Sequence, residues 1–318
     1  MIKMNDKIYC SCCGVENSIN QNYCKDCGEV LHNFKEYETN NEINTIEELF
    51  TATHYHQLTD KILRIESYKA IIQNIIETGE NEIIYKKKMT PLNRIKAIAD
   101  AYAKVIYKNR GNTYGEYAYN VICIDKQFDS AIQIATILHE LTHHLFNEII
   151  EEILIFLWNV RKTPMLESFI QTMITIPSIL LISEYCASSI EKEYLPPEYV
   201  SYSSFNSICA DLNYDKNIIL RAVIIGKSMT ESIHQILSTF IDKELEEKII
   251  KEFQINNTKT IAEPICITDI EKSNYILQNV YLMDMIINSY EIMNDKQIYP
   301  KIIKNKEYYE KFYEKESA

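Results

Sequence analysis

Residues 129–149 read DSAIQIATILHELTHHLFNEI, and the spacing of their apolar residues decides how this part of the chain folds. An apolar residue recurs every three or four positions, which is the period of one face of an α-helix. The residues of this face are Ile134, Leu138, Leu141, Leu145 and Ile149. Asp129 or Ser130 can cap the start of the helix. The stretch therefore predicts an amphipathic helix that carries HELTH, residues 139–143, near its middle.

HELTH matches the pattern HExxH, in which two histidines one helical turn apart bind one zinc ion. At about 100° per residue, His139 and His143 lie about 40° apart around the helix axis, so both imidazoles can reach one metal. Glu140 lies beside the metal, where a carboxylate can take a proton from zinc-bound water and pass it to a leaving amine. The alternatives are a helix with two surface histidines and a degenerate, inactive zinc site.

Two histidines alone hold zinc too weakly, so the site needs a third protein ligand. The extended pattern HExxHxxGxxH is excluded, because Phe146 and Ile149 stand where its Gly and third His would be. A carboxylate from a following helix is the other common solution. Three glutamates on or just past the HELTH helix point poorly for this role, namely Glu148, Glu151 and Glu152.

The remaining candidates for the third ligand are Glu167 and Glu184. Glu184 lies in SILLISEYCASSIEKEYLPP, residues 178–197, which reads as a helix bounded by prolines. Ala187 and Ser188 follow one turn later, and small residues there allow this helix to approach the HELTH helix closely. We therefore prefer Glu184 as the third ligand and keep Glu167 as the alternative.

Residues 9–28 read YCSCCGVENSINQNYCKDCG and contain two Cys-x-x-Cys pairs. Two such turns present four thiolates to one zinc ion at the corners of a tetrahedron. The predicted ligands are Cys10, Cys13, Cys24 and Cys27, with Cys12 as a spare thiol. We expect a small zinc ribbon whose metal supplies its folding energy. Its slightly acidic charge favours a structural or protein-contact role over DNA binding.

The composition restricts the fold of the remaining chain. The sequence has 6 Gly and 7 Pro, whereas average usage would give about 22 and about 16. Strands and tight turns consume glycine, so a β-sandwich, a barrel and a glycine-cradled nucleotide fold are excluded. We expect a mainly α protein with a small β-sheet, to which YGEYAYNVICID (114–125) contributes a strand and NEIIYK (81–86) a possible second one.

Helical periodicity also covers the regions around these strands. One pattern runs from Thr45 to Thr78, with Gly79 where a C-terminal cap belongs. A second begins at Thr90-Pro91, includes Val105 and Ile106, and closes near Gly111. The expected organisation is a zinc ribbon (1–37), a polar linker (38–44), a core that carries HELTH (45–200) and a helical C-terminal region (201–318).

Charge and cysteine usage bear on partners and location. The net charge of −12 opposes binding to nucleic acid or to an anionic membrane. The N-terminus shows no secretory signal, and the 9 cysteines read as metal ligands and buried thiols in a reducing cytoplasm. The most apolar stretch, residues 153–183, is interrupted by charges and prolines, so we expect a buried helix and not a membrane span.

Three segments together resemble the ImmA/IrrE-type zinc metallopeptidases of bacteria and their mobile genetic elements. They are VICID (121–125), SAIQIATILHELTHHLF (130–146) and EYCASSIEKEYLPP (184–197), which match a short strand, an HExxH helix and a downstream E-x-x-A helix that ends near a proline. The resemblance covers about 115–197. It implies a zincin-like, gluzincin-like α+β core with His139, His143 and Glu184 as metal ligands and Glu140 as the general base. It also implies a chosen regulatory protein, often a transcriptional repressor, as substrate.

The first hypothesis is therefore a cytoplasmic zinc metallopeptidase with one catalytic and one structural zinc ion. The second is a non-enzymatic interaction or regulatory protein with two structural zinc sites. A third is a membrane-associated protease that embeds residues 153–183. A peptidase also needs a donor for the transition-state oxyanion, and three residues stay open as candidates: His144, Tyr185 and Tyr194.

Overall fold

The computed structural model describes residues 7–9, 16–18, 25, 42–52, 63, 65–83, 88–108, 114–158, 160–256, 262–266 and 275–316. The chain divides into two compact units, Met1–Asn41 and Glu42–Ala318. In the first unit, β1 (Lys7–Tyr9) pairs antiparallel with β2 (Glu16–Ser18). All five cysteines of the expected ribbon lie outside the described residues, so the ribbon stays a prediction.

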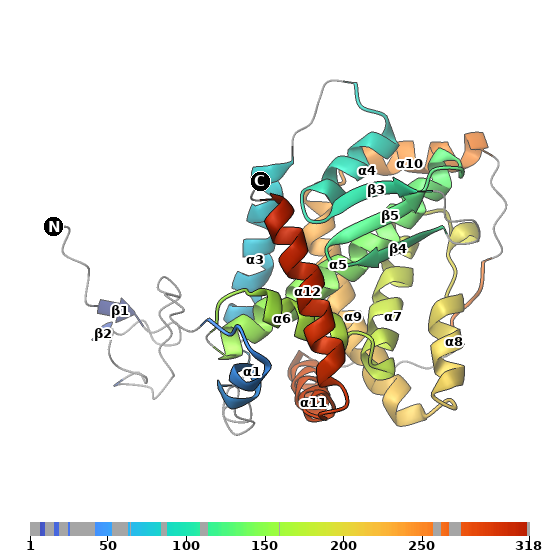
Figure 1. The fold of residues 1–318 in the computed structure, drawn as a ribbon. Helices are drawn as coiled ribbons and strands as arrows, with labels where there is room; N and C mark the ends of the chain where they lie inside the picture. Colours follow the sequence, from blue (N-terminus) through green and yellow to red (C-terminus); the bar gives the residue numbers. More distant parts are fainter. Residues whose placement is uncertain are drawn as a thin grey trace. The chain divides into compact units, whose positions relative to one another are not determined.

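The second unit is mostly helical and contains one three-stranded sheet, which confirms the expected mainly α class with a small β-sheet (Figure 1). Its strands are β3 (Lys104–Lys108), β4 (Gly115–Ala118) and β5 (Val121–Asp125), in the order β3-β5-β4. β3 runs parallel to β5, and β4 runs antiparallel to it. β4 is therefore an edge strand of this sheet.

The single strand expected over residues 114–125 is instead a β-hairpin. Tyr119 and Asn120 form its turn with φ of 51° and 57°. Positive φ at both central residues is the geometry of the type I′ turn, whose twist suits a two-residue hairpin. Asn adopts this conformation readily, so Tyr119-Asn120 reverses the chain where the sequence pattern alone suggests continuity.

The helix expected from Thr90 to about Gly111 is shorter, because the chain changes to β3. α4 (Pro91–Asp100) begins as expected, with the Thr90 hydroxyl accepting the Asn93 N–H at 3.2 Å. It ends at Asp100, whose carboxylate accepts the Val105 N–H at 3.0 Å. Val105 and Ile106 then pair with β5, in keeping with the preference of β-branched residues for strands.

The long helix expected over residues 45–78 appears as α1 (Ile46–Ala52) and α3 (Ile65–Glu82). Gly79 lies inside α3 and is not its cap. A Cβ at Gly79 would lie 2.2 Å from the Tyr102 hydroxyl oxygen, so this position serves close packing. Residues 81–82 end α3 and are not a strand, whereas 84–86 lie outside the described residues.

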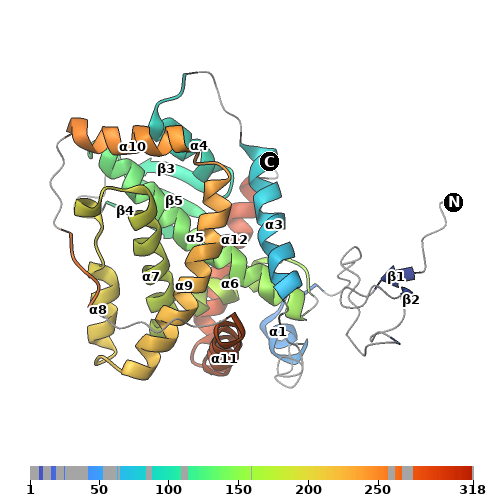
Figure 2. The ribbon, with the colours of Figure 1, turned by 180° about the vertical axis from the view of Figure 1, so that it is seen from behind.

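α5 (Ser130–Trp158) is the central helix of the second unit. It contacts β4 and β5 on one side and α7 (Pro177–Tyr194) on another. α9 (Lys216–Ser238) packs on α7 and on α3, and Figure 2 shows it between them. The remaining elements are α6 (Pro164–Met173), a 3₁₀ turn η1 (Pro197–Tyr199), α8 (Ser203–Asp211), α10 (Lys243–Asn256), α11 (Tyr275–Met293) and α12 (Tyr299–Glu316).

One hydrophobic core connects these helices, and it includes residues from both sides of position 200, such as Leu181 and Val223. The boundary expected at residue 200 therefore falls inside this core. The end of the expected linker is also packed, since Ile43 is buried and its carbonyl accepts the Thr163 hydroxyl at 2.6 Å. Among the described helices, none alone is long and apolar enough to cross a membrane, and α6 with α7 reaches that length only as a pair bent by 88°.

Candidate metal centre

The helix that carries HELTH forms as its sequence predicts. The Asp129 carboxylate accepts the Ile132 N–H at 3.0 Å and thus caps the first turn of α5. All residues of the expected apolar face are fully buried, namely Ile134, Leu138, Leu141, Leu145 and Ile149. This face fixes the rotation of α5 about its axis, which aims His139 and His143 towards α7.

Three predicted ligands come together between α5 and α7. The Nε2 atom of His139 lies 3.6 Å from Oε2 of Glu184, and Nε2 of His143 lies 3.6 Å from Oε1 of the same carboxylate. One ligand atom from each residue lies within 4.8 Å of the other two, so the triad could hold a metal ion. Ala187 and Ser188 on α7 are buried, in keeping with the close approach expected of the two helices.

The donor set of this triad fits a zinc ion. Two imidazole nitrogens and one carboxylate oxygen form a common three-ligand zinc site that keeps a fourth position open. Glu184 supplies a further indication, because its Oε2 atom is buried and has no hydrogen-bond partner. A buried carboxylate oxygen without a partner is costly, and a cation between it and the two imidazoles would remove that cost.

Two residues of α7 hold the other ring nitrogens of the histidines. Oε1 of Glu191 lies 3.0 Å from Nδ1 of His139, and Oγ of Ser183 lies 2.7 Å from Nδ1 of His143. Such contacts fix the orientation of metal-binding imidazoles and leave Nε2 free for the ion. Sequence reasoning missed both residues. The available signal was position, since Glu191 follows Glu184 by seven residues, two helical turns along the same face.

The surroundings favour metal-binding protonation states for two of the ligands. Burial lowers the pKa of His143 to about 4, so its imidazole is neutral at neutral pH. Burial opposes ionisation of Glu184, but the neighbouring His143 and His139 lower its pKa to about 2. For His139, burial is outweighed by the charge of Glu191, and its pKa lies well above the usual value. A bound cation would displace that proton, because metal binding requires a neutral imidazole.

Glu140 lies where the edge strand meets α5. Its side chain is buried, and burial raises its pKa to about 7 even though the backbone N–H of Tyr117 donates to the carboxylate. Gly115 allows this approach: a Cβ there would lie 2.3 Å from Cγ2 of Thr136 and 3.4 Å from Oε1 of Glu140. β4 therefore passes directly over the turn of α5 that precedes and includes Glu140.

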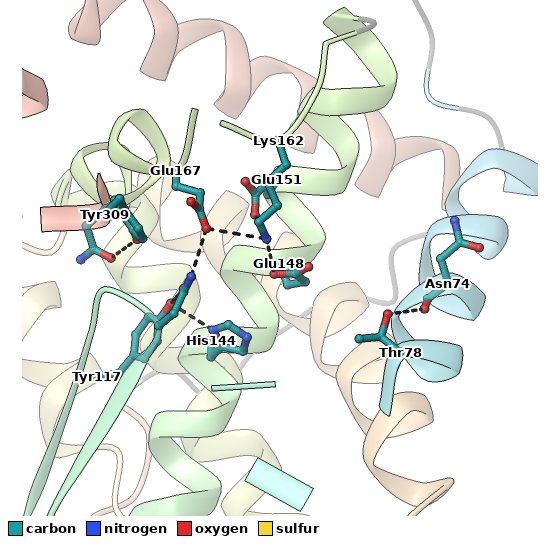
Figure 3. Close-up of polar contacts among 11 residues, drawn as sticks. Asn74, Thr78, Tyr117, His144, Glu148, Glu151, Lys162, Glu167 and Tyr309 are labelled. Carbon is teal, nitrogen blue, oxygen red and sulfur yellow. Dashed lines mark hydrogen bonds and ion pairs between the residues drawn. The ribbon is translucent and has the colours of Figure 1, made fainter. Parts of the chain in front are cut away.

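The alternative third ligand, Glu167, lies elsewhere. Its Oε1 atom accepts the Asn120 amide at 3.0 Å and lies 3.8 Å from Nζ of Lys162. Figure 3 shows it in a buried acidic cluster with Glu148 and Glu151. The structure thus brings Glu184, and not Glu167, to His139 and His143.

The three open oxyanion candidates have other contacts. Nδ1 of His144 lies 3.1 Å from the Tyr117 hydroxyl at the acidic cluster. The Tyr194 hydroxyl lies 3.3 Å from Nδ1 of His234. The ring of Tyr185 packs on Gly226, where a Cβ would lie 2.5 Å from Cδ1 of the tyrosine. This contact between α7 and α9 explains a glycine for which the sequence pattern gives no reason.

Comparison with known proteins adds no assignment. No protein-family model matches the chain, and neither a curated protein nor a solved structure matches it.

Proposed function

We propose that this protein is a zinc-dependent metallopeptidase that hydrolyses a peptide bond with a metal-activated water. The observation that carries this proposal is the approach of His139, His143 and Glu184, whose ligand atoms lie within 4.8 Å of one another. A non-enzymatic protein needs no general base beside such a triad. Here Glu140 is adjacent in the helix, buried, and has a pKa of about 7.

Each residue then has a defined task. Zinc, when bound, lowers the pKa of a water molecule and polarises a peptide carbonyl. Glu140, which lies near His139 and Glu184, would take a proton from that water and give it to the leaving amine. Burial raises the pKa of Glu140, whereas a bound zinc ion would lower it, so the carboxylate would be ready to accept a proton at neutral pH. Glu191 and Ser183 keep the two imidazoles in the orientation that the metal requires.

The edge strand supports a peptide as the substrate. In the described part of the chain, β4 pairs with β5 along one side only. An extended peptide can add to such an edge through main-chain hydrogen bonds. Because the N–H of Tyr117 in β4 donates to Glu140, a peptide docked on this strand would lie next to the general base.

A specific regulatory protein is the substrate that the resemblance to ImmA/IrrE-type enzymes favours, and a transcriptional repressor is the leading kind. In this proposal the N-terminal ribbon, with its own structural zinc on Cys10, Cys13, Cys24 and Cys27, contributes to docking of that protein. The protein acts in the cytoplasm, where its free cysteines stay reduced.

Glu140→Gln tests the proposal. We expect the variant to bind as much zinc as the wild type and to lose cleavage, because the amide cannot accept the proton. The measurement is mass spectrometry of new peptide termini after incubation with a peptide library, with zinc content determined in parallel. Glu247→Gln, at an exposed position of α10, is the matched control and should cleave normally.

Two results would contradict the mechanism. Undiminished cleavage by Glu140→Gln would remove Glu140 as the base. A wild-type protein that cleaves nothing and adds a fourth protein ligand to the zinc at His139, His143 and Glu184, as seen in a zinc-bound crystal structure, would instead support the non-enzymatic alternative.

A further inference from the structure

A second polar site lies on another side of α5, in a small cavity among α5, α6, α12 and the β4–β5 hairpin. Its lining includes Tyr117, Asn147, Glu148, Glu151 and Glu167, and its volume is about 10 Å³. That is the room that one water molecule or one ion of similar size needs. The cavity is thus small, acidic and separate from the metal triad.

The charges around this cavity do not balance. Nζ of Lys162 lies 2.7 Å from Oε2 of Glu151, 3.3 Å from Oε2 of Glu148 and 3.8 Å from Oε1 of Glu167 (Figure 3). One ammonium therefore faces three carboxylates, which leaves a formal charge of −2. Glu151 and Glu167 are only 4% and 3% exposed, so water screens their charges little, whereas the side chains of Lys162 and Glu148 are partly exposed.

Two oxygen atoms in the lining also lack partners. Oε1 of Glu151 and Oδ1 of Asn147 are buried and have no hydrogen-bond partner. Both residues are more than nine-tenths buried, and both line the cavity. Buried acceptors are rarely left without a partner in folded proteins, because each costs about 1–3 kcal/mol. The cavity thus presents two acceptors and an excess of negative charge to whatever occupies it.

The protonation of the cluster points the same way. Burial and the neighbouring Glu148 and Glu167 raise the pKa of Glu151 to about 8, although Lys162 opposes this shift. For Glu148, burial is outweighed by Lys162, and its pKa lies below the usual value. At neutral pH a proton thus offsets one negative charge, and a bound cation would take the place of that proton.

We propose that this cavity binds one monovalent cation, that is K⁺, Na⁺ or ammonium, through Oε1 of Glu151 and Oδ1 of Asn147. A divalent ion fits less well, because it needs a compact set of ligands. Among the described residues, only His139, His143 and Glu184 bring three such ligand atoms within 4.8 Å of one another. The glutamates of the cavity are instead spread around the ammonium of Lys162.

A cation at this position would stabilise the packing of the β4–β5 hairpin on α5. The Tyr117 hydroxyl donates to Oδ1 of Asn120 at 3.3 Å and lies 3.1 Å from Nδ1 of His144. Asn120 in turn donates to Glu167 of α6 at 3.0 Å. The ion would therefore stabilise the junction of α5, α6 and the hairpin. This proposal is independent of peptidase activity, so its test measures stability.

The test is thermal unfolding of the full chain in KCl, NaCl, NH₄Cl or N-methyl-D-glucamine chloride. All salts are used at one concentration, so that screening is the same and only the size of the cation differs. For a dissociation constant about one tenth of the salt concentration, binding raises Tm by about 2–4 °C in a chain of this size. We expect this rise with one or more of the small cations relative to N-methyl-D-glucamine.

Glu151→Gln should abolish the difference between salts. Its amide can turn the oxygen to Lys162, which removes the unpaired charge and replaces the unpartnered Oε1 acceptor with an NH₂ donor. We expect this variant to unfold at one temperature in all four salts, above the wild type in N-methyl-D-glucamine. Glu247→Gln removes the same charge at an exposed site and should keep the wild-type response.

The wild-type measurement alone can overturn the proposal, whatever the variants do. Equal Tm in all four salts would exclude a selective monovalent site, and a response that survives Glu151→Gln would place the ion elsewhere. Stabilisation by Ca²⁺ in a His143→Ala background, if lost with Glu151→Gln, would assign the cavity to a divalent ion instead. In crystals grown with Rb⁺, an anomalous peak between Glu151 and Asn147 would support the site.

Discussion

Glu191→Gln tests how the metal centre is built, because Glu191 acts on the metal only through His139. Its Oε1 atom lies 3.0 Å from Nδ1 of His139, and its side chain is 12% exposed. The substitution keeps the size of the side chain and removes its charge. The amide oxygen can still accept a hydrogen bond from Nδ1, but a neutral acceptor polarises the imidazole less.

The expected loss follows from that contact. A hydrogen bond to a charged group contributes about 1.5–3 kcal/mol, against about 0.5–1.5 kcal/mol for a neutral one. The difference of about 1–2 kcal/mol corresponds to a zinc affinity lower by about 5- to 30-fold. This agrees with the 10- to 100-fold range, roughly, that is typical when a partner of a metal-binding histidine is removed.

The assay is competition for zinc against a chromophoric chelator at fixed pH, with the ribbon zinc as a constant background. Glu193→Gln is the matched control, since Glu193 is exposed on the same helix, two residues further on. Glu191→Asp should recover part of the affinity if the charge matters. A zinc affinity of Glu191→Gln within a factor of two of Glu193→Gln would refute the assignment of Glu191 as the residue that orients His139.

Four further predictions test other parts of the structure. Ser183→Ala removes a neutral hydrogen bond to His143 and should weaken zinc binding by about 2- to 10-fold in the same assay, less than Glu191→Gln. An unchanged zinc affinity would contradict the role of Ser183 in orienting His143. Cleavage should rise with pH as Glu140 loses its proton, with a midpoint below about 7, because a bound zinc ion lowers the pKa that burial raises. A pH–rate profile that is flat from pH 4 to 8 would exclude this base. Gly226→Ala should destabilise the fold by about 1–3 kcal/mol, because the new methyl group meets the Tyr185 ring. The free energy of unfolding is measured with a denaturant, and Lys227→Ala is the control. Equal stability of the two variants would show that the ring can move away. In N-methyl-D-glucamine chloride, stability should fall as pH rises from about 4.5 to about 8, since the folded state holds the proton of Glu151 to a higher pH than the unfolded chain does. Glu151→Gln should lose this part of the dependence of the unfolding free energy on pH. An unaltered dependence would mean that Glu151 ionises normally.

The helices of the metal centre were predictable because their signals are local. The apolar period fixes which face of α5 is buried, and Pro177 and Pro196 mark where α7 can begin and end. Preference for Glu184 over Glu167 also came from local sequence, through the small residues Ala187 and Ser188 one turn further on.

The sheet was harder to predict, because its signals depend on distant partners. Val105 and Ile106 continue the helical period of the preceding residues, so periodicity alone places them in a helix. They pair with Ile122 and Cys123 of β5 instead, and that contact is absent from any local window. The turn at Tyr119-Asn120 is hidden for a related reason, since Asn tolerates positive φ without requiring it.

The acidic cavity lies on a second polar stripe of α5, which the HELTH motif does not include. His144, Glu148 and Glu151 follow one another at intervals of four and three residues, which places them on one stripe of α5 more than a third of a turn from the stripe of His139 and His143. Read as metal ligands for HELTH, Glu148 and Glu151 point the wrong way. Read as a second stripe, the same spacing predicts a polar site of its own on the other side of the helix. A polar stripe on a helix that the structure buries on nearly every side must meet partners of opposite charge, and Lys162 supplies only one. The excess charge of that stripe is therefore the reason to look for a cation there.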